Sequence, residues 1–350
     1  MRFAIDAMGG DHAPDAIVKG CLDALADLAG DDRLILIGDR PVIEDIIRER
    51  GLDIRREPRI EIVHTSQVIG MHESPVDAVR SKPDSSIVKM SIMGSARKSP
   101  DPVDIVISAG NTGACVSAAT MYMKRLPGVH RPGIACTIPA LHGPVVLCDV
   151  GANPEPRASH LAQYALMAET LARRVLGIAR PRVALMNIGA EEGKGTDLIR
   201  EVRELLRRMP DLNYVGYIEG RELFDGAADV VVTDGFVGNT MLKLAEGLAR
   251  SLFKAIAQEV LTHDPGLALQ LQNVMAGLQK KNDYHEYGGA PLLGVNGVCI
   301  ICHGSSEART IRNTIRVSRE YVSRNVNQAI VERIEGVHRS IGPMEAGEAA

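Results

Sequence analysis

The sequence predicts an α/β protein with three layers, in which helices cover both faces of a mostly parallel β-sheet. Three observations lead to this fold class. Short runs of Val, Ile and Leu alternate with helical patterns along the whole chain. These runs are continuously apolar, which is typical of parallel strands that are buried on both faces. Several of them lead through a Gly/Asn/Asp turn into a helical pattern, as right-handed β-α-β crossovers do.

The apolar runs and the helical spacing between them give the elements in order. The predicted strands are 2–6, 33–37, 60–64, 103–108, 145–149, 182–188, 213–218, 228–233 and 298–302. The predicted helices are 15–29, 41–50, 113–125, 158–176, 196–209 and 239–260. No internal repeat interrupts this alternation, so the sequence favours one continuous α/β architecture.

The segment 239–283 departs from the alternation. A helical pattern from Thr240 to about Leu261 breaks at 262–266 and resumes to about Lys281, with no strand between. This pattern predicts an αα-hairpin that projects from the sheet. Apolar residues surround the break. We prefer to interpret them as a dimer interface or a packing surface between lobes, and the alternative is a tip that contacts a membrane surface or an acyl chain.

The length of 350 residues accommodates one large domain with two lobes. We expect a single catalytic domain over 1–335. One lobe would comprise about 1–132 plus 288–335, and the other about 133–287, including the hairpin 239–283. The Gly/Ala/Glu-rich stretch 342–350 is predicted to be a disordered tail.

Composition excludes several classes of protein. A net charge of −4 offers no global basic field for nucleic acid. No apolar run is long enough to cross a bilayer, and the chain starts with a strand-like segment rather than a signal peptide. Six dispersed cysteines do not form a disulfide framework, so we expect a cytoplasmic protein. Cys299 and Cys302 form a C-x-x-C pattern, but on a strand they point to opposite faces and cannot share a metal ion.

Four glycine-containing turns follow predicted strands, at 6–12, 108–113, 149–153 and 233–239. A strand that enters a helix through such a turn leaves free N–H groups at the positive end of the helix dipole, which suits an anion. We expect the turns to converge at the carboxyl edge of one parallel sheet and to form a cleft for a phosphate-bearing ligand.

Motifs for other chemistry are missing. The segment 189–196 resembles a P-loop but has the wrong spacing, although Lys194 could neutralise an anion or be simply solvated. The sequence contains no G-x-G-x-x-G, H-E-x-x-H or G-x-S-x-G pattern. We therefore expect no metal and no cofactor, and a site that works by anion binding and electrostatic stabilisation. His12 and His303 lie at strand ends on the expected cleft edge, where each could be catalytic or structural.

Six motifs together carry a family resemblance. They are 6–14 (DAMGGDHAP), 108–113 (SAGNTG), 149–153 (DVGAN), 233–239 (TDGFVGN), 287–290 (YGGA) and 303–306 (HGSS). In this order, from residue 1 to about 330, the chain closely resembles the bacterial phosphate acyltransferases of phospholipid synthesis.

The resemblance implies an activity and partners. It implies transfer of a long-chain acyl group from acyl-carrier protein to inorganic phosphate, giving acyl phosphate for a membrane glycerol-3-phosphate acyltransferase. It implies an isocitrate/isopropylmalate dehydrogenase-like fold and a homodimer, soluble or peripherally associated with the cell membrane. Where those dehydrogenases carry two metal-binding aspartates, this chain has Asn239 and Lys243, which disfavours a metal.

The family motifs and the glycine turns together give the expected site. Lys194 and Asn239 fall in family motifs and are the expected catalytic pair, and His303 is a third candidate, as the acid that protonates the thiolate. The expected phosphate-binding residues are Gly9, Gly10, Asp11, His12, Gly110, Asn111, Thr112, Gly113, Asn153, Asp234, Gly235 and Gly238. Because a thioester is already reactive, phosphate could attack it directly while the protein positions and stabilises charge.

Other mechanisms and functions also fit the sequence. A covalent route would use Cys115, Cys136 or Cys148; Cys115 starts a helix but has no neighbouring His, so we expect a structural thiol. The chain could instead be a phosphotransacetylase-like enzyme acting on acyl-CoA. It could also be a non-catalytic protein that binds acyl-ACP or serves as a membrane scaffold. Detection of acyl phosphate would separate these functions.

Overall fold

A computed structural model describes residues 1–209, 211–281, 287–342 and 344. In this part of the chain, eleven strands form one sheet in the order β3-β2-β1-β4-β11-β10-β5-β6-β9-β7-β8. The strands are β1 Arg2–Asp6, β2 Arg33–Gly38, β3 Ile60–His64, β4 Ile105–Ser108, β5 Gly133–Ile138, β6 Val145–Cys148, β7 Val183–Met186, β8 Tyr214–Ile218, β9 Val230–Val232, β10 Ala290–Leu293 and β11 Val298–Ile301.

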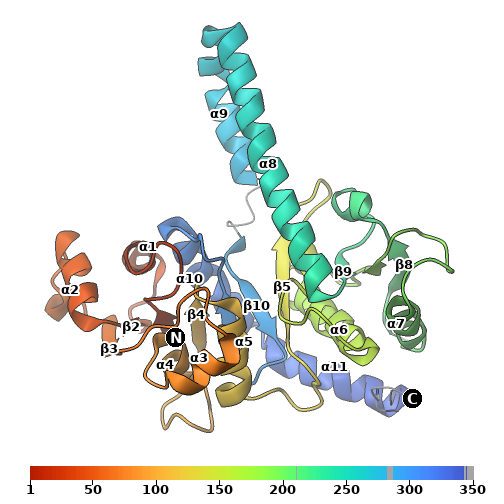
Figure 1. Cartoon of the computed structure of the whole chain (residues 1–350), viewed down its shortest axis with the longest axis horizontal. Helices are drawn as coiled ribbons and strands as arrows, with labels where there is room; N and C mark the ends of the chain where they lie inside the picture. Colours follow the sequence, from red (N-terminus) through yellow and green to blue (C-terminus); the bar gives the residue numbers. More distant parts are fainter. Residues whose placement is uncertain (210, 282–286, 343, 345–350) are drawn as a thin grey trace.

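Helices surround the sheet, and two of them extend away from it (Figure 1). The α-helices are α1 Asp15–Ala24, α2 Arg40–Glu49, α3 Pro75–Ser81, α4 Ser86–Met93, α5 Thr112–Ala118, α6 Ala158–Arg174, α7 Asp197–Arg207, α8 Gly235–His263, α9 Pro265–Lys281, α10 Ala308–Ser323 and α11 Val326–Ile341. A π-helical turn, Ala119–Met123, continues α5.

Two hydrophobic cores confirm the three layers. Successive residues of β1 point to opposite faces, as the pleat requires: Phe3 and Ile5 join one core and Ala4 joins the other. The first core contains residues of α1, α2, α6, α10 and α11, and the second contains residues of α3, α4 and α5. The sheet is therefore covered on both faces, which explains why most of its strands are continuously apolar.

The strands run in two parallel groups of opposite direction. β3, β2, β1, β4 and β11 are mutually parallel, and so are β6, β9, β7 and β8. Between these groups, β10 is antiparallel to β11 and to β5, and β5 is antiparallel to β6. Three reversals in succession turn the second group round relative to the first. The expected convergence of all four turns at one carboxyl edge is therefore wrong.

The strand pairing nevertheless aligns the carboxyl end of β4 in the first group with the carboxyl end of β6 in the second group. Ile107 near the end of β4 pairs with Ile300, which pairs with Pro291 of β10. The next residue of β10, Leu292, pairs with Ile134, and Cys148 at the end of β6 pairs with Ala135, the residue after Ile134. The turns that follow β4 and β6 thus begin at nearly the same height in the sheet, although the two strands run in opposite directions.

All nine predicted strands and all six predicted helices are present, with ends shifted by a few residues. The sequence reading missed β5 and β10. β10 contains Pro291, a residue that normally argues against a strand, and it is only four residues long. The predicted helices also lack α3, α4, α10 and α11, although serines typical of helix starts stand at the beginning of α4 (Ser85, Ser86) and just before α10 (Ser305, Ser306). The hairpin of α8 and α9 is confirmed, with its break at Asp264; of the predicted tail, 343 and 345–350 lie outside the described residues.

Candidate active site

The turn after β6 is organised by a buried carboxylate. The side chain of Asp149 is fully buried and accepts hydrogen bonds from the main-chain N–H groups of Ile134, Gly151, Ala152 and Asn153, at 2.7–3.2 Å. Burial raises the pKa of Asp149, and these four donors act in the opposite direction. One carboxylate therefore fixes the whole turn that follows the strand.

The start of α8 packs directly against this turn. A Cβ atom on Gly238 would lie 1.9 Å from the carbonyl oxygen of Asp149, and one on Gly235 would lie 2.7 Å from that of Asn153. Only glycine fits at such close approaches between two backbones. Asp234 caps the helix by accepting the N–H of Val237 at 2.8 Å. These three predicted phosphate-binding residues thus have a structural role as well.

Asn239 and Lys194 lie on neighbouring parts of this second group of strands. The side chain of Asn239 lies against Gly151, with its Cγ 3.7 Å from where a Cβ on that glycine would be. Lys194 is exposed, on the loop between β7 and α7. Because β7 pairs with β9, which leads into α8, the two residues leave adjacent strands.

Asn187, which the sequence reading did not select, holds the Lys194 loop. Its side-chain amide donates to the carbonyl groups of Gly189 at 3.1 Å and Lys194 at 3.3 Å. Gly195 follows with φ of +93°, and a Cβ there would lie 2.4 Å from the Asn187 side-chain oxygen. The loop is therefore shaped by one buried amide and one obligatory glycine.

A second buried carboxylate organises the turns after β1 and β4. Asp6 accepts the Ser108 hydroxyl at 2.7 Å and the N–H of Met8 at 3.1 Å, and burial raises its pKa. A Cβ on Gly9 would lie 2.7 Å from the Cα of Gly110. These two glycines therefore serve close packing of the two turns.

The turn after β11 joins the same group. The N–H of Asp11 donates to the carbonyl oxygen of Gly304 at 2.7 Å, and Gly10 approaches that oxygen with φ of +118°. His303 is exposed, and its Nδ1 contacts the Ser305 hydroxyl at 2.8 Å. His12 is exposed beside Asp11. His303 thus belongs to the first group of turns, whereas Lys194 and Asn239 belong to the second.

Asn111 and Asn153 use their side chains within the protein. Asn111 caps α5 through the N–H of Ala114, at 3.0 Å, and its amide donates to three carbonyl groups of the segment 70–73. Asn153 donates to the carbonyl oxygen of Pro132 and to the hydroxyl of Tyr164, both at 2.7 Å. Each asparagine fixes the backbone near it. Thr112 and Gly113 form the first turn of α5.

One turn of each group, the turn after β4 and the turn after β6, borders a cavity of about 830 Å³, whose lining does not include Lys194, Asn239 or His303. Gly113, Val116, Ser117 and Thr120 line it from one face of α5 and its continuation, because residues three and four apart in a helix share a face. Ala152 and Asn153 line it from the turn after β6, and the segment 124–132 provides much of the remaining wall.

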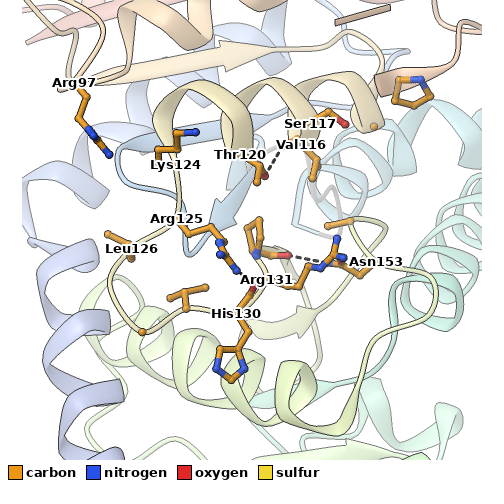
Figure 2. A pocket seen from close by; sticks show the side chains of 16 residues that line it. Arg97, Val116, Ser117, Thr120, Lys124, Arg125, Leu126, His130, Arg131 and Asn153 are labelled. Carbon is orange, nitrogen blue, oxygen red and sulfur yellow. Dashed lines mark hydrogen bonds between the residues drawn. The ribbon is translucent and has the colours of Figure 1, made fainter. Parts of the chain in front are cut away.

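The wall of this cavity is strongly cationic. Its lining includes the basic residues Arg97, Lys124, Arg125, His130 and Arg131, and no Asp or Glu among the residues that the structure describes. In Figure 2, Lys124 and Arg125 lie to the left, Asn153 lies to the right, and Arg131 lies between them. His130 points away from α5 toward α6, where its ring stacks edge-on with that of His160 at 6.2 Å between centroids.

The described residues offer no metal site and no activated thiol. No cluster of three or more His, Cys, Asp or Glu side chains in this part of the chain could hold a metal ion. All six cysteines are free and buried. Burial raises the pKa of Cys115 and Cys148 well above the ordinary thiol value and that of Cys136 to about 12. Cys299 and Cys302 belong to opposite cores, as expected.

Comparison with known proteins identifies the family. The family model described as "Fatty acid synthesis protein" matches residues 1–329. A phosphate acyltransferase of Heliobacterium modesticaldum is 45% identical over 338 residues, covering 96% of this chain and 98% of its own length. That of Dictyoglomus turgidum is 42% identical over 340 residues, covering 96% and 98%. The chain belongs to the phosphate acyltransferase family.

Solved structures with low identity share the fold of this family member. A phosphotransacetylase from Streptococcus pyogenes superposes with a TM-score of 0.61 at 17% identity and covers 94% of each chain. A branched-chain phosphotransacylase from Enterococcus faecalis gives 0.54 at 15%, covering 92% of this chain and 99% of its own. This likeness supports the predicted α/β fold class. Within the described residues, no helix combines the length and apolarity that crossing a membrane requires.

The sequence reading missed the segment 124–132, which forms much of the cavity wall. It lies between α5 and β5 and reads KRLPGVHRP, so three of its nine residues are Lys or Arg and a fourth is His. That density of basic residues in a Pro/Gly-containing loop was the available signal. It carried no glycine turn after a strand, and β5 itself was not predicted, so the loop had no place in the expected cleft.

Proposed function

We propose that this protein transfers a long-chain acyl group from acyl-carrier protein to inorganic phosphate and releases acyl phosphate. The family match over residues 1–329 is the observation that carries the proposal, because it spans both groups of turns and the cavity between them. The expected product is a mixed anhydride that a membrane glycerol-3-phosphate acyltransferase can consume.

The proposed reaction needs no covalent enzyme intermediate. A phosphate oxygen attacks the thioester carbon, a tetrahedral oxyanion forms, and the carbon–sulfur bond breaks to release the carrier thiolate. Asn239 donates to the oxyanion, and Lys194 neutralises charge on phosphate or on the departing thiolate. His303 protonates that thiolate. The glycine turns hold the phosphate between them, with Gly113 on the cavity wall.

The proposal includes a homodimer in the cytoplasm. Support comes from the exposed apolar side chains of α8, among them Leu244, Leu248 and Leu252, which recur every four residues and are 57–69% exposed. The residues near the hairpin turn, such as Leu261 and Leu269, are the candidates for peripheral contact with the inner face of the cell membrane. Arg250 and Lys254 are exposed on α8 and offer a docking point for the acidic carrier; the side chains of Lys280 and Lys281 lie outside the described residues.

One assay tests the proposed function. The protein is mixed with phosphate and either palmitoyl-ACP or acetyl-CoA, and acyl phosphate is trapped with hydroxylamine. We expect hydroxamate from palmitoyl-ACP. Lys194→Ala and Asn239→Ala should each lower the rate about a hundred- to a thousandfold, or ~3–4 kcal/mol in the barrier, because each removes a group that stabilises developing charge.

The outcomes of this assay separate the alternatives. Product from acetyl-CoA only would indicate a phosphotransacetylase-like enzyme, and no product from either donor would indicate a binding protein. Folded Lys194→Ala and Asn239→Ala variants with wild-type turnover would overturn the catalytic assignment. Lys19→Ala, on α1 and outside the cavity lining, is the matched control and should keep near-normal activity.

A further inference from the structure

We propose that the cationic wall of the cavity, formed by Arg97, Lys124, Arg125 and Arg131, is a binding site for a phosphoryl group. The identity of the ligand rests on the proposed function, in which both substrates carry phosphorus. One source is orthophosphate. The other is the phosphodiester that joins the pantetheine arm to a carrier protein. The chemistry of recognition is the same for both.

Uncompensated charge is the first support. No carboxylate lines the cavity, and none of these four cations forms an ion pair with a carboxylate in the described residues. Arg182, by contrast, is paired with Asp229 at 2.8 Å. Cations that share a cavity repel one another, and a bound phosphoryl group would turn that repulsion into attraction.

The pKa values of two neighbouring histidines are lowered in part by the same positive charges. Burial and, to a smaller extent, the nearby charges of Arg131, His130, Arg157 and Arg125 together lower the pKa of His160 to about 4. The pKa of His130 is also lowered, by burial first and then by His338 and Arg125. Both imidazoles are therefore neutral near pH 7, and neither adds to the repulsion.

The wall is held in place before any ligand binds. Gln163 of α6 is fully buried; its side-chain Oε1 accepts the N–H of His130 at 2.7 Å, and its side-chain Nε2 donates to the carbonyl oxygen of Gly128 at 2.8 Å. The N–H of Leu126 donates to the carbonyl oxygen of Gly294 at 2.9 Å. A fixed backbone reduces the entropy that a ligand must offset.

The cavity is large enough for either source of the phosphoryl group, orthophosphate or the phosphodiester of a pantetheine arm. At about 830 Å³ it falls in the range of sites for extended small molecules, roughly 300–1,000 Å³, and far exceeds one phosphate ion. Its lining also includes apolar side chains, such as Val116, Leu126 and Val129. The cations could therefore hold a phosphoryl group while an arm or an acyl group occupies the rest.

Binding measurements test this inference without turnover. Isothermal titration calorimetry would compare wild type with Arg97→Gln and Arg131→Gln, using orthophosphate, 4′-phosphopantetheine and phosphorus-free pantetheine as probes. Neither arginine side chain has a partner in the described residues, so both variants should fold normally, which thermal unfolding checks. Arg50→Gln, at the end of α2 and outside the cavity, is the matched control.

We expect both cavity variants to bind at least one phosphorus-containing probe about 10- to 100-fold more weakly, as expected for loss of a hydrogen bond to a charged group. Pantetheine and the Arg50→Gln control should show no change. The probe that loses affinity identifies the source. The inference is overturned if both cavity variants keep wild-type affinity for both probes, or if wild type binds neither. Failure of the proposed function would appear separately, as absence of hydroxamate from the wild-type enzyme.

Discussion

At the residue scale, two buried aspartates organise the site. Asp6 and Asp149 lie at or just after the ends of strands in the two opposed groups, and each accepts main-chain N–H groups from the turn that follows its strand. Burial alone would favour the neutral acid, and the donated hydrogen bonds favour the carboxylate. Glycines then allow the neighbouring backbones to approach these turns.

Gly238→Ala should destabilise the protein by about 3 kcal/mol or prevent folding. The added Cβ would lie 1.9 Å from the carbonyl oxygen of Asp149, and neither atom can move without a shift of the main chain that carries it. Gly247→Ala in the same helix is the control, because no atom lies within 4 Å of its added Cβ. Helix propensity should make that variant more stable by up to ~1 kcal/mol.

Urea unfolding of the two variants measures this difference. If Gly238→Ala unfolds at the same urea concentration as Gly247→Ala, the close approach of α8 to the Asp149 turn is not the reason for the glycine. The sequence reading selected Gly235 and Gly238 for phosphate binding. It could not see their packing role, because the contact partner lies about ninety residues earlier in the chain.

At the element scale, local patterns were sufficient for most elements and failed where an element is short or lacks an apolar run. The nine apolar strands and the αα-hairpin follow from composition and spacing alone. β10 could not be predicted in this way, because Pro291 argues against a strand. α10 could not be predicted over its full length, because its basic and polar residues alternate with isolated apolar ones. The reversal through β10 and β5 depends on pairs such as Leu292 with Ile134, which no local pattern encodes.

The hairpin offers a test at this scale. Leu248→Glu combined with Leu252→Glu should convert the proposed dimer into a monomer, because charge would replace apolar area on the exposed face of α8. Sedimentation velocity measures the change. Leu269→Glu near the turn is the control, since it should leave the dimer intact. A monomeric wild type, or a double variant that stays dimeric, would contradict the proposed interface.

At the scale of the whole molecule, the opposed strand groups explain how distant motifs share one cavity. The strand ends meet near one row of the sheet, so Gly113 and Asn153 line the same space although their strands run in opposite directions. The sequence motifs indicated the correct family. The cationic wall, by contrast, became visible only once the segment 124–132 was placed between the two groups.

The central claim is that phosphate attacks the carrier-bound acyl group directly. The most direct measurement mixes the enzyme with palmitoyl-ACP in the absence of phosphate and follows free carrier and intact protein mass. Because the buried cysteines, including Cys115, have raised thiol pKa values, we expect no acylated enzyme and no carrier release until phosphate is added. An acyl mass on the enzyme, with one equivalent of carrier released before phosphate, would contradict the account.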